Sequence, residues 1–302
     1  MNILVTGITG YVGSRLAPRL ARDGHSVRGF SRRDASLDYP NFRGDVISSE
    51  GLERALEGVE VAYYLIHSME ASLEDSFPAR ERRAAENFAR AARAAGVSRV
   101  IYLGGLAPAS SSASVHLRSR LEVERILLEA TPCSVALRAS IVIGAGSRSF
   151  RFLVRLVERL PVLAMPAWRT NRTAPIDERD TIELLVRSAT NDAVCGQALD
   201  AGGPETVTYE ELIDRIRDCM LLNRPAVRLR RLTLTPIASR VSAVIAGEDH
   251  ALVGPLMAGL DGDLLPRDDR AARLLGVRLH GLDAAIEHAL GEWEAREPLA
   301  AR

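Results

Sequence analysis

The first 145 residues alternate short apolar runs with longer amphipathic stretches. Runs that are apolar almost throughout are typical of parallel strands covered on both faces, and an apolar period of 3.6 residues predicts a helix. The predicted strands are residues 2–6, 25–31, 59–66, 99–105 and 133–143, and the clearest helix is residues 78–96. This alternation predicts an α/β fold with a doubly wound parallel sheet and right-handed crossovers.

After about residue 145 the strand pattern weakens and helical periodicity dominates. Helices are predicted at 149–160, 177–190, 208–222 and 282–295, two shorter ones at 241–260, a short strand at 198–203, and irregular, proline-rich backbone at 161–176. We therefore expect residues 1–145 to form a Rossmann NAD(P)-binding domain whose sheet is completed by segments near 173–202. Residues 146–302 are expected to form a smaller, mainly helical substrate-binding lobe.

The glycine-rich turn after the first predicted strand carries the clearest chemical signal. Gly7, Gly10 and Gly13 lie between that strand and a predicted helix, which is the context that a dinucleotide-binding βαβ unit needs. One glycine permits the tight turn, one lets the backbone approach a pyrophosphate, and one lets the helix pack on the strand. The N–H groups at the start of the helix would then bind the phosphates. The alternative is a turn with a structural role alone.

The end of the second predicted strand distinguishes between the two nicotinamide dinucleotides. An NAD-binding protein places an acidic residue there for the ribose 2′-hydroxyl, but this chain has Ser31, Arg32 and Arg33, and Asp34 comes late. A serine and two guanidinium groups suit a 2′-phosphate, so we expect NADP(H) as cofactor. In the alternative, the arginines only face solvent. Asp45, in the segment GDV at 44–46, is expected to accept a hydrogen bond from the adenine amine.

Composition narrows the range of partners. The formal net charge is zero, with 39 basic and 39 acidic residues, which argues against nucleic acid or an anionic membrane because both require a basic face. Every basic residue is an arginine, so the chain has no lysine for a Schiff base or a proton shuttle. No run of about 18 apolar residues predicts a membrane span. We expect a small-molecule substrate and a monomer or homodimer.

The cysteines and the first residues of the chain indicate the cellular compartment of the protein. Cys133, Cys195 and Cys219 are scattered and show neither metal-binding spacing nor a disulfide framework, which favours a reducing compartment. The first residues, MNILVTG, run straight into a strand and leave no room for a signal peptide. We therefore expect a cytoplasmic protein without a metal site.

The motifs together resemble those of the atypical and extended short-chain dehydrogenase/reductases. The resemblance is carried by TGITGYVG at 6–13, GDV at 44–46, the segment 84–106, HLRSRLEVERIL at 116–127, RASIVIGAG at 138–146 and TAPIDERDT at 173–181. YYLIHSM and YLGGL are similar to the NAD(P)H-binding branch, which includes NmrA-like proteins and the accessory NADPH-binding subunit of respiratory complex I. The resemblance implies a Rossmann fold and a nicotinamide cofactor.

The resemblance also implies where the cofactor lies along the strand ends. Residues 65–67 would line the nicotinamide ribose and pyrophosphate, residues 104–105 would pass beneath the nicotinamide, and residues 139–141 would close over its carboxamide. The expected cofactor-binding residues are Gly7, Thr9, Gly10, Tyr11, Val12, Gly13, Ser31, Arg32, Arg33, Asp45, Val46, Leu65, Ile66, His67, Gly104, Arg120, Ala139, Ser140 and Ile141.

The expected catalytic positions depart from the family. There, a tyrosine, a lysine four residues later and a serine after the fifth strand carry out proton transfer; here the pattern falls on His116, Arg120 and Gly105. A histidine is a competent general acid near neutral pH, and a nearby arginine favours release of its proton. His116 and Arg120 lie one helical turn apart on one face. Without a serine, an oxyanion partner would come from His67, backbone amides near Gly105, or the run Ser110–Ser114. In the alternative, His116 is a first-turn residue without a chemical role.

Two further groups have structural interpretations beside functional ones. Asp177 and Asp180 precede or begin a predicted helix, where capping is favoured over chemistry. Four large apolar residues of the lobe are candidates for a substrate wall, although such residues usually belong to a core: Met165, Trp168, Met220 and Met257.

These patterns predict an NADPH-dependent oxidoreductase that acts on a small, apolar carbonyl or conjugated carbonyl compound. His116 would donate the proton or orient the oxygen, and Arg120 would anchor the ribose. Two alternatives stay open. One is a non-catalytic NADP(H)-binding sensor or assembly protein, which the missing tyrosine, lysine and serine favour. The other is a non-redox isomerase, epimerase or cyclase that uses the same pocket.

Overall fold

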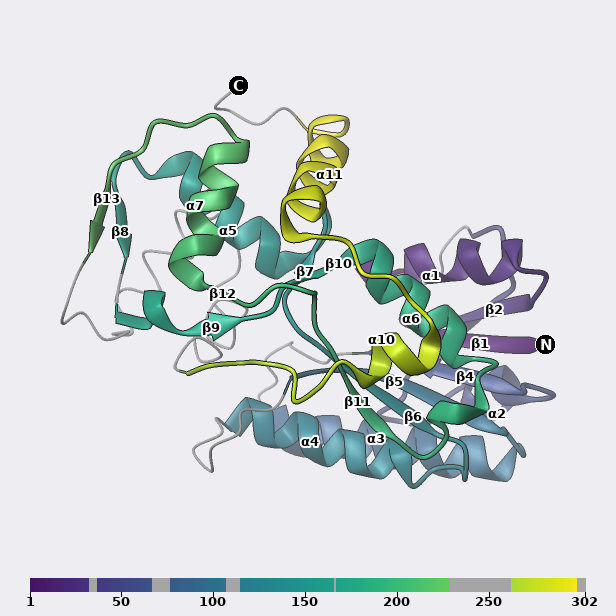
Figure 1. Ribbon diagram of the computed structural model, residues 1–302. Helices are drawn as coiled ribbons and strands as arrows, with labels where there is room; N and C mark the ends of the chain where they lie inside the picture. The colour runs from purple at the N-terminus through teal and green to yellow at the C-terminus, as the bar shows by residue number, and fades with distance from the viewer. Residues whose placement is uncertain (33–36, 67–76, 107–114, 166, 229–261, 298–302) are drawn as a thin grey trace.

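A seven-stranded parallel sheet forms the centre of the computed structural model, which describes residues 1–32, 37–66, 77–106, 115–165, 167–228 and 262–297 (Figure 1). The strand order is β11-β6-β5-β4-β1-β2-β3. The strands are β1 (Asn2–Thr6), β2 (Ser26–Ser31), β3 (Asn41–Arg43), β4 (Val61–Tyr64), β5 (Arg99–Gly105), β6 (Val135–Ala139) and β11 (Ala198–Ala201). The predicted α/β fold with a doubly wound parallel sheet is confirmed.

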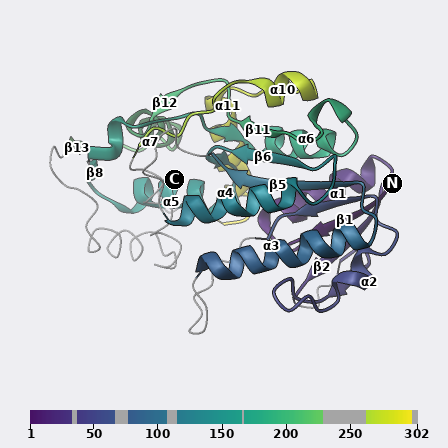
Figure 2. The same cartoon turned by 90° about the horizontal axis from the view of Figure 1, so that it is seen from below.

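Helices cover both faces of the sheet. One layer consists of α2 (Leu52–Leu56), α3 (Phe77–Ala94) and α4 (Val115–Leu128), of which α3 and α4 lie side by side (Figure 2). The other consists of α1 (Tyr11–Arg22), α6 (Glu178–Ser188) and α10 (Arg270–Leu275). Neighbouring residues of a strand point to opposite faces. Tyr63 accordingly donates a hydrogen bond to the Leu185 carbonyl of α6 at 2.9 Å, whereas the Tyr64 ring packs against Phe88 of α3.

A second core lies in the C-terminal part of the chain. It is built mainly from α5 (Arg148–Arg159), α7 (Tyr209–Cys219) and α11 (Leu282–Glu294), whose apolar faces bury Phe150, Ile216 and Trp293 completely or almost so. Met165, Trp168 and Met220 are buried in the same core, so the structure supports their interpretation as packing residues; Met257 lies outside the described residues. None of the described helices is long and apolar enough to cross a membrane.

The expectation of irregular backbone at 161–176 was wrong in part. This segment contains β8 (Leu163–Met165), the 3-10 helix η1 (Ala167–Thr170), β9 (Arg172–Thr173) and the start of β10 (Ile176–Asp177). The three strands β8, β9 and β10 pair, in this order, with β13 (Ala226–Arg228), β12 (Val207–Thr208) and β7 (Val142–Ile143). Strands of two or three residues show no periodicity, and each pairs with a distant segment. The two helices predicted at 241–260 lie outside the described residues.

The expectation that the cysteines form no disulfide was also wrong. Cys133 and Cys195 are joined by a disulfide, of which Cys219 is not part. The two partners are separated by 62 residues in sequence and meet because the strands that follow them, β6 and β11, are neighbours in the sheet. Such a pair has no signature in the spacing of three scattered cysteines.

The close approach of α1 to β1 depends on glycine. A Cβ atom at Gly13 would lie 2.7 Å from Ile8 Cα and would collide with the Gly7 carbonyl, and Gly7 itself has a φ of +67°. A side chain at position 13 would therefore push the first turn of the helix away from the strand end.

We expect Gly13→Ala to lower the free energy of unfolding by about 2 kcal/mol because the added methyl group has no room. Gly291→Ala is the matched control, since Gly291 lies within α11 and an added Cβ there would meet no heavy atom of the described residues within 4 Å. That change should stabilise the protein by about 0.5–1 kcal/mol through helix propensity alone. Urea unfolding of both variants measures the difference, and equal effects would contradict the tight packing at Gly13.

Candidate dinucleotide-binding site

The glycine turn presents backbone at the start of α1. Gly7 donates to the Phe30 carbonyl of β2 at 3.2 Å, and Gly10 donates to the Gly7 carbonyl at 2.8 Å, which closes the turn. Gly10 is the N-cap residue of α1, and within the described part of the chain no side chain caps this helix end. Thr9 and Gly10 are exposed at the tip of the turn. The first amides of α1 are thus placed to bind an anion, as in dinucleotide-binding turns.

The strand ends around this turn are held by hydrogen bonds. Thr6 donates to the Tyr63 carbonyl at 2.9 Å and accepts from the Leu65 amide at 3.2 Å, so β1 and the segment after β4 are tied together. A Cβ at Gly7 would lie 3.1 Å from the Leu65 carbonyl oxygen. Leu65 and Ile66 therefore pass beside the glycine turn, and His67 lies outside the described residues.

The expected adenosine end lies at the ends of β2 and β3. Ser31 is buried and accepts a hydrogen bond from Asn41 Nδ2 at 2.9 Å, and Arg32 follows it with an exposed side chain. Arg33 is outside the described residues. Asp45 Oδ1 accepts from the Ile47 amide at 2.6 Å, so one carboxylate oxygen already serves the turn.

Asn87 is a residue that the sequence did not single out. Its Nδ2 donates to the carbonyls of Val46 and Ile47, at 2.9 and 2.7 Å, and so fastens the loop after β3 to α3. The Val46 side chain is buried in the core between the sheet and α3. Any contact of Val46 with an adenine would therefore come from its backbone.

The expected nicotinamide position lies at the end of β5. The Tyr102 ring covers Gly104, since a Cβ on Gly104 would lie 2.8 Å from that ring. Among the described residues, a Cβ on Gly105 would meet only the Ala139 carbonyl, at 4.0 Å. With respect to this part of the chain, position 105, where the family carries a serine, is thus the open one. Gly104 could reach a cofactor through its backbone only.

The positive charge of Arg120 lies near two buried tyrosines. Arg120 is half-buried on α4, and the rings of Tyr64 and Tyr102 lie with centroids 6.2 Å apart. Burial raises the pKa of both phenols well above the ordinary value, and the nearby positive charge of Arg120 opposes that rise. Tyr102 was not singled out from the sequence, although it lies two residues before Gly104 in the same strand. The side chain of His116, in the first turn of α4, lies outside the described residues.

The segment after β6 is held in place by hydrogen bonds to residues that come later in the chain. The Ser140 amide donates to the Ala201 carbonyl of β11 at 2.9 Å, and the Ser140 hydroxyl shares a hydrogen bond with Thr173 at 3.2 Å. The Ile141 carbonyl accepts from the Ile176 amide at 2.9 Å. Ala139, Ser140 and Ile141 are therefore placed by segments that lie 30 or more residues later in the chain.

Glu178 connects the glycine turn to the C-terminal core. Its carboxylate accepts hydrogen bonds from the Tyr11 hydroxyl and from Arg15 Nε, and Arg15 also donates to Glu292 of α11 at 2.7 Å. The Arg15 guanidinium lies 4.7 Å from the centroid of the Tyr11 ring. Burial and the neighbouring Glu178 charge raise the pKa of Tyr11, so the phenol stays protonated as a donor.

This arrangement assigns the Tyr11 side chain to structure. The ring lies against the segment after β7, where a Cβ at Gly146 would come within 2.5 Å of it. The expectation that Tyr11 contacts a cofactor can therefore hold only for its backbone N–H. Asp177 caps α6 by accepting from the Arg179 amide at 2.7 Å, as predicted, and Asp180 accepts from the His280 amide at 2.7 Å.

The fold and the site define a class of protein. Residues 3–144 match the model of the NAD dependent epimerase/dehydratase family. This part of the chain is therefore similar to that family, in agreement with the resemblance of its motifs to the extended short-chain dehydrogenase/reductases.

Individual relatives differ in activity. Ceramide reductase of Caulobacter vibrioides is 30% identical over 190 residues, which cover 61% of this chain and 59% of that protein. Subunit 9 of the mitochondrial NADH dehydrogenase [ubiquinone] 1 alpha subcomplex of Arabidopsis thaliana is 25% identical over 227 residues, 71% of this chain and 56% of that protein. The chain thus matches little more than half the length of these relatives.

Solved structures share the architecture. The UDP-glucuronic acid 4-epimerase from Bacillus cereus, in complex with UDP-glucuronic acid and NAD, superposes with a TM-score of 0.73 over 98% of this chain and 100% of that chain. The sequence identity is 16%, so this likeness shows the fold alone.

We expect Tyr11→Phe to lower the free energy of unfolding by about 2 kcal/mol because a buried carboxylate loses a hydrogen-bond donor. Glu183→Gln is the matched control. It removes the charge of Glu183 from two partly exposed ion pairs, one with Arg19 at 3.0 Å between the same two helices and one with Arg187 at 2.6 Å within α6. This change should cost less than about 1 kcal/mol. Chemical denaturation measures the free energy of unfolding of both variants. An equal loss in both would show that the Glu178 contacts stabilise the protein no more than the Glu183 contacts do.

Proposed function

We propose that the protein is an NADPH-dependent oxidoreductase that reduces a small, apolar carbonyl or conjugated carbonyl compound. The observation that supports this best is the uncapped amino end of α1 behind Gly7, Gly10 and Gly13. Glycine at these positions leaves backbone N–H groups accessible, which fits the pyrophosphate of a nicotinamide dinucleotide.

The preference for NADPH rests on the end of β2. Ser31 ends the strand, Arg32 is exposed directly after it, and Arg33 follows in the sequence. Guanidinium groups pair well with phosphate and remain charged at any working pH. In the proposed complex, Arg32 and Arg33 hold the 2′-phosphate, and the Asp45 oxygen that Ile47 does not use accepts from the adenine amine.

The proposed chemistry takes place at the carboxyl ends of β5 and β6. NADPH, when bound, supplies a hydride. The open position at Gly105 leaves room for a substrate carbonyl, and His116 donates the proton that the carbonyl oxygen gains. The Arg120 charge, four residues from His116, favours release of that proton and holds the nicotinamide ribose.

One of three comparisons supports a redox reaction, and the other two keep other functions open. The reductase from Caulobacter vibrioides supports reduction of a carbonyl compound. The complex I subunit from Arabidopsis thaliana favours the second candidate, an NADP(H)-binding assembly or sensor protein, since glycine stands where the family has a serine. The matching family model favours a third, an epimerase-like reaction without net cofactor change.

The first test measures NADPH oxidation against a panel of carbonyl and enone compounds. We expect turnover in the wild type and a loss of kcat of about 100-fold or more in His116→Phe, because a general acid contributes that much. His288→Phe, on an exposed face of α11, is the matched control and should keep full activity. Tight NADPH binding without any turnover would favour a binding protein. Product formation without NADPH oxidation would favour the non-redox enzyme.

The second test concerns cofactor choice. We expect Arg32→Ala combined with Arg33→Ala to weaken NADPH binding by about 10–100-fold, since charged hydrogen bonds to the 2′-phosphate are lost, while NADH affinity stays the same. Arg22→Ala, at the far end of α1, shows the effect of removing one positive charge away from the proposed phosphate site. Fluorescence titration with each dinucleotide gives the dissociation constants. Unchanged NADPH affinity in the double variant would rule out the assigned phosphate site.

A further inference from the structure

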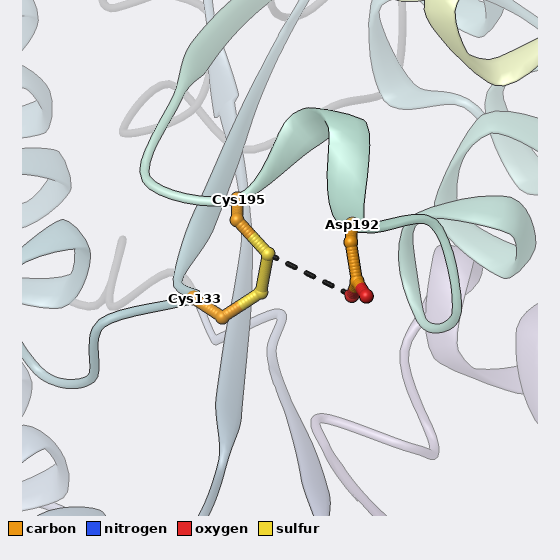
Figure 3. Close-up of side chains that lie close together, drawn as sticks. All are labelled: Cys133, Asp192 and Cys195. Atoms are coloured by element: carbon orange, nitrogen blue, oxygen red, sulfur yellow. Dashed lines mark hydrogen bonds between the residues drawn. A yellow bond between two sulfur atoms is a disulfide. The ribbon is translucent and has the colours of Figure 1, made fainter.

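The cysteine pair lies at the amino ends of the strands, away from the glycine turn. Cys133 precedes β6, and Cys195 follows the 3-10 helix η2 (Asp192–Val194) and precedes β11. These parallel strands are neighbours, with Ala136 opposite Ala198. Figure 3 shows the disulfide between the two turns and the carboxylate of Asp192 beside it. Both cysteines are partly exposed, so dissolved thiols and disulfides can reach them.

A fixed positive charge stands beside both sulfur atoms. Nη2 of Arg99 lies 2.9 Å from Cys133 Sγ and 3.4 Å from Cys195 Sγ, and it also donates to Asp192 at 2.5 Å. The Arg99 side chain is only 7% exposed, and its Nη1 donates to the Ser188 carbonyl at 2.7 Å. Arginine does not lose its proton, and a cation beside a cysteine stabilises the thiolate, which is the reactive form.

We propose that Cys133 and Cys195 form a reversible thiol–disulfide exchange site that small disulfides oxidise and small thiols reduce. This inference does not rest on the proposed oxidoreductase activity, because the site lies at the other end of the strands.

The exchange is balanced in atoms and electrons. The Cys133 thiolate, which is nearer to Arg99, attacks one sulfur of an external disulfide, forms a mixed disulfide and releases the first external thiolate. The Cys195 thiolate then attacks Cys133 Sγ, forms the bond drawn in Figure 3 and releases the second. The two protons of the protein thiols end on the two released thiolates. Two electrons pass from the protein dithiol to the external disulfide.

A metal site is the competing interpretation of the same residues. The sulfur atoms of Cys133 and Cys195 and a carboxylate oxygen of Asp192 lie within 4.8 Å of one another. However, Asp192 is already paired with Arg99, and the guanidinium would repel a divalent cation at this place. A structural zinc ion also takes four ligands, and this group offers three. The contacts therefore favour exchange between sulfur atoms over metal binding.

The disulfide would reinforce the edge of the sheet. β11 is the edge strand of the seven-stranded sheet and, among the described strands, pairs with β6 alone. At its far end, Asp200 is held by Arg138 at 3.4 Å and by Arg267 at 2.8 Å. The cross-link ties the opposite end covalently and closes a 62-residue separation, which restricts the unfolded chain. Oxidation is therefore expected to stabilise the fold without adding contacts at the cofactor site.

The test equilibrates the full chain with mixtures of reduced and oxidised glutathione, traps free thiols with N-ethylmaleimide and counts them by intact mass. We expect two of the three thiols to disappear together as the oxidised fraction rises, and to return on reduction. The oxidised chain should have a Tm about 5 °C or more above that of the reduced chain. Cys219→Ser should keep both effects, and Cys133→Ser should lose both.

Three results would overturn the proposal. The first is that the two thiols remain free at every glutathione ratio. The second is a Tm that is the same in the oxidised and reduced wild type. The third is one zinc ion per reduced chain with both thiols protected from alkylation. Cys195→Ser removes the same disulfide, so it should give the same thiol count and Tm as Cys133→Ser. Agreement between the two variants would show that neither result comes from misfolding of one variant.

Discussion

The position of β1 in the middle of the sheet is the constraint on which the site depends. β1 lies between β4 and β2, and the chain extends from it in both directions, so the carboxyl end of β1 is the topological switch point of the sheet. Gly7, Gly10 and Gly13 allow α1 to begin at that point.

The C-terminal part of the chain is attached to the same helix. Glu178, at the start of α6, accepts from Tyr11 and Arg15, and Arg15 reaches Glu292 of α11. The glycine turn and the second core therefore share one partly buried charge network. The segment that carries Ser140 is likewise held by β11 and by Thr173. A ligand bound at the turn would thus lie next to contacts that join the two parts.

Some of the candidate site residues that depart from the family pattern can be explained by the residues that surround them in the structure. Gly104 accommodates the Tyr102 ring, and Arg120 places its charge near the buried phenols of Tyr102 and Tyr64. In a chain without lysine, arginine is the side chain that can hold a permanent positive charge at position 120. Gly105 leaves the position of the family's serine open.

The sequence by itself determined the fold class, the glycine turn and most helices and strands, because each of these is encoded by periodicity or spacing within about 20 residues. It failed for the short strands of 161–176, which have too few residues to show a period. Only the tertiary structure decided which distant residues meet. Tyr11 and Glu178 are 167 residues apart, and Cys133 and Cys195 are 62 residues apart. Their contacts depend on which strands and helices become neighbours, and no local pattern records that choice.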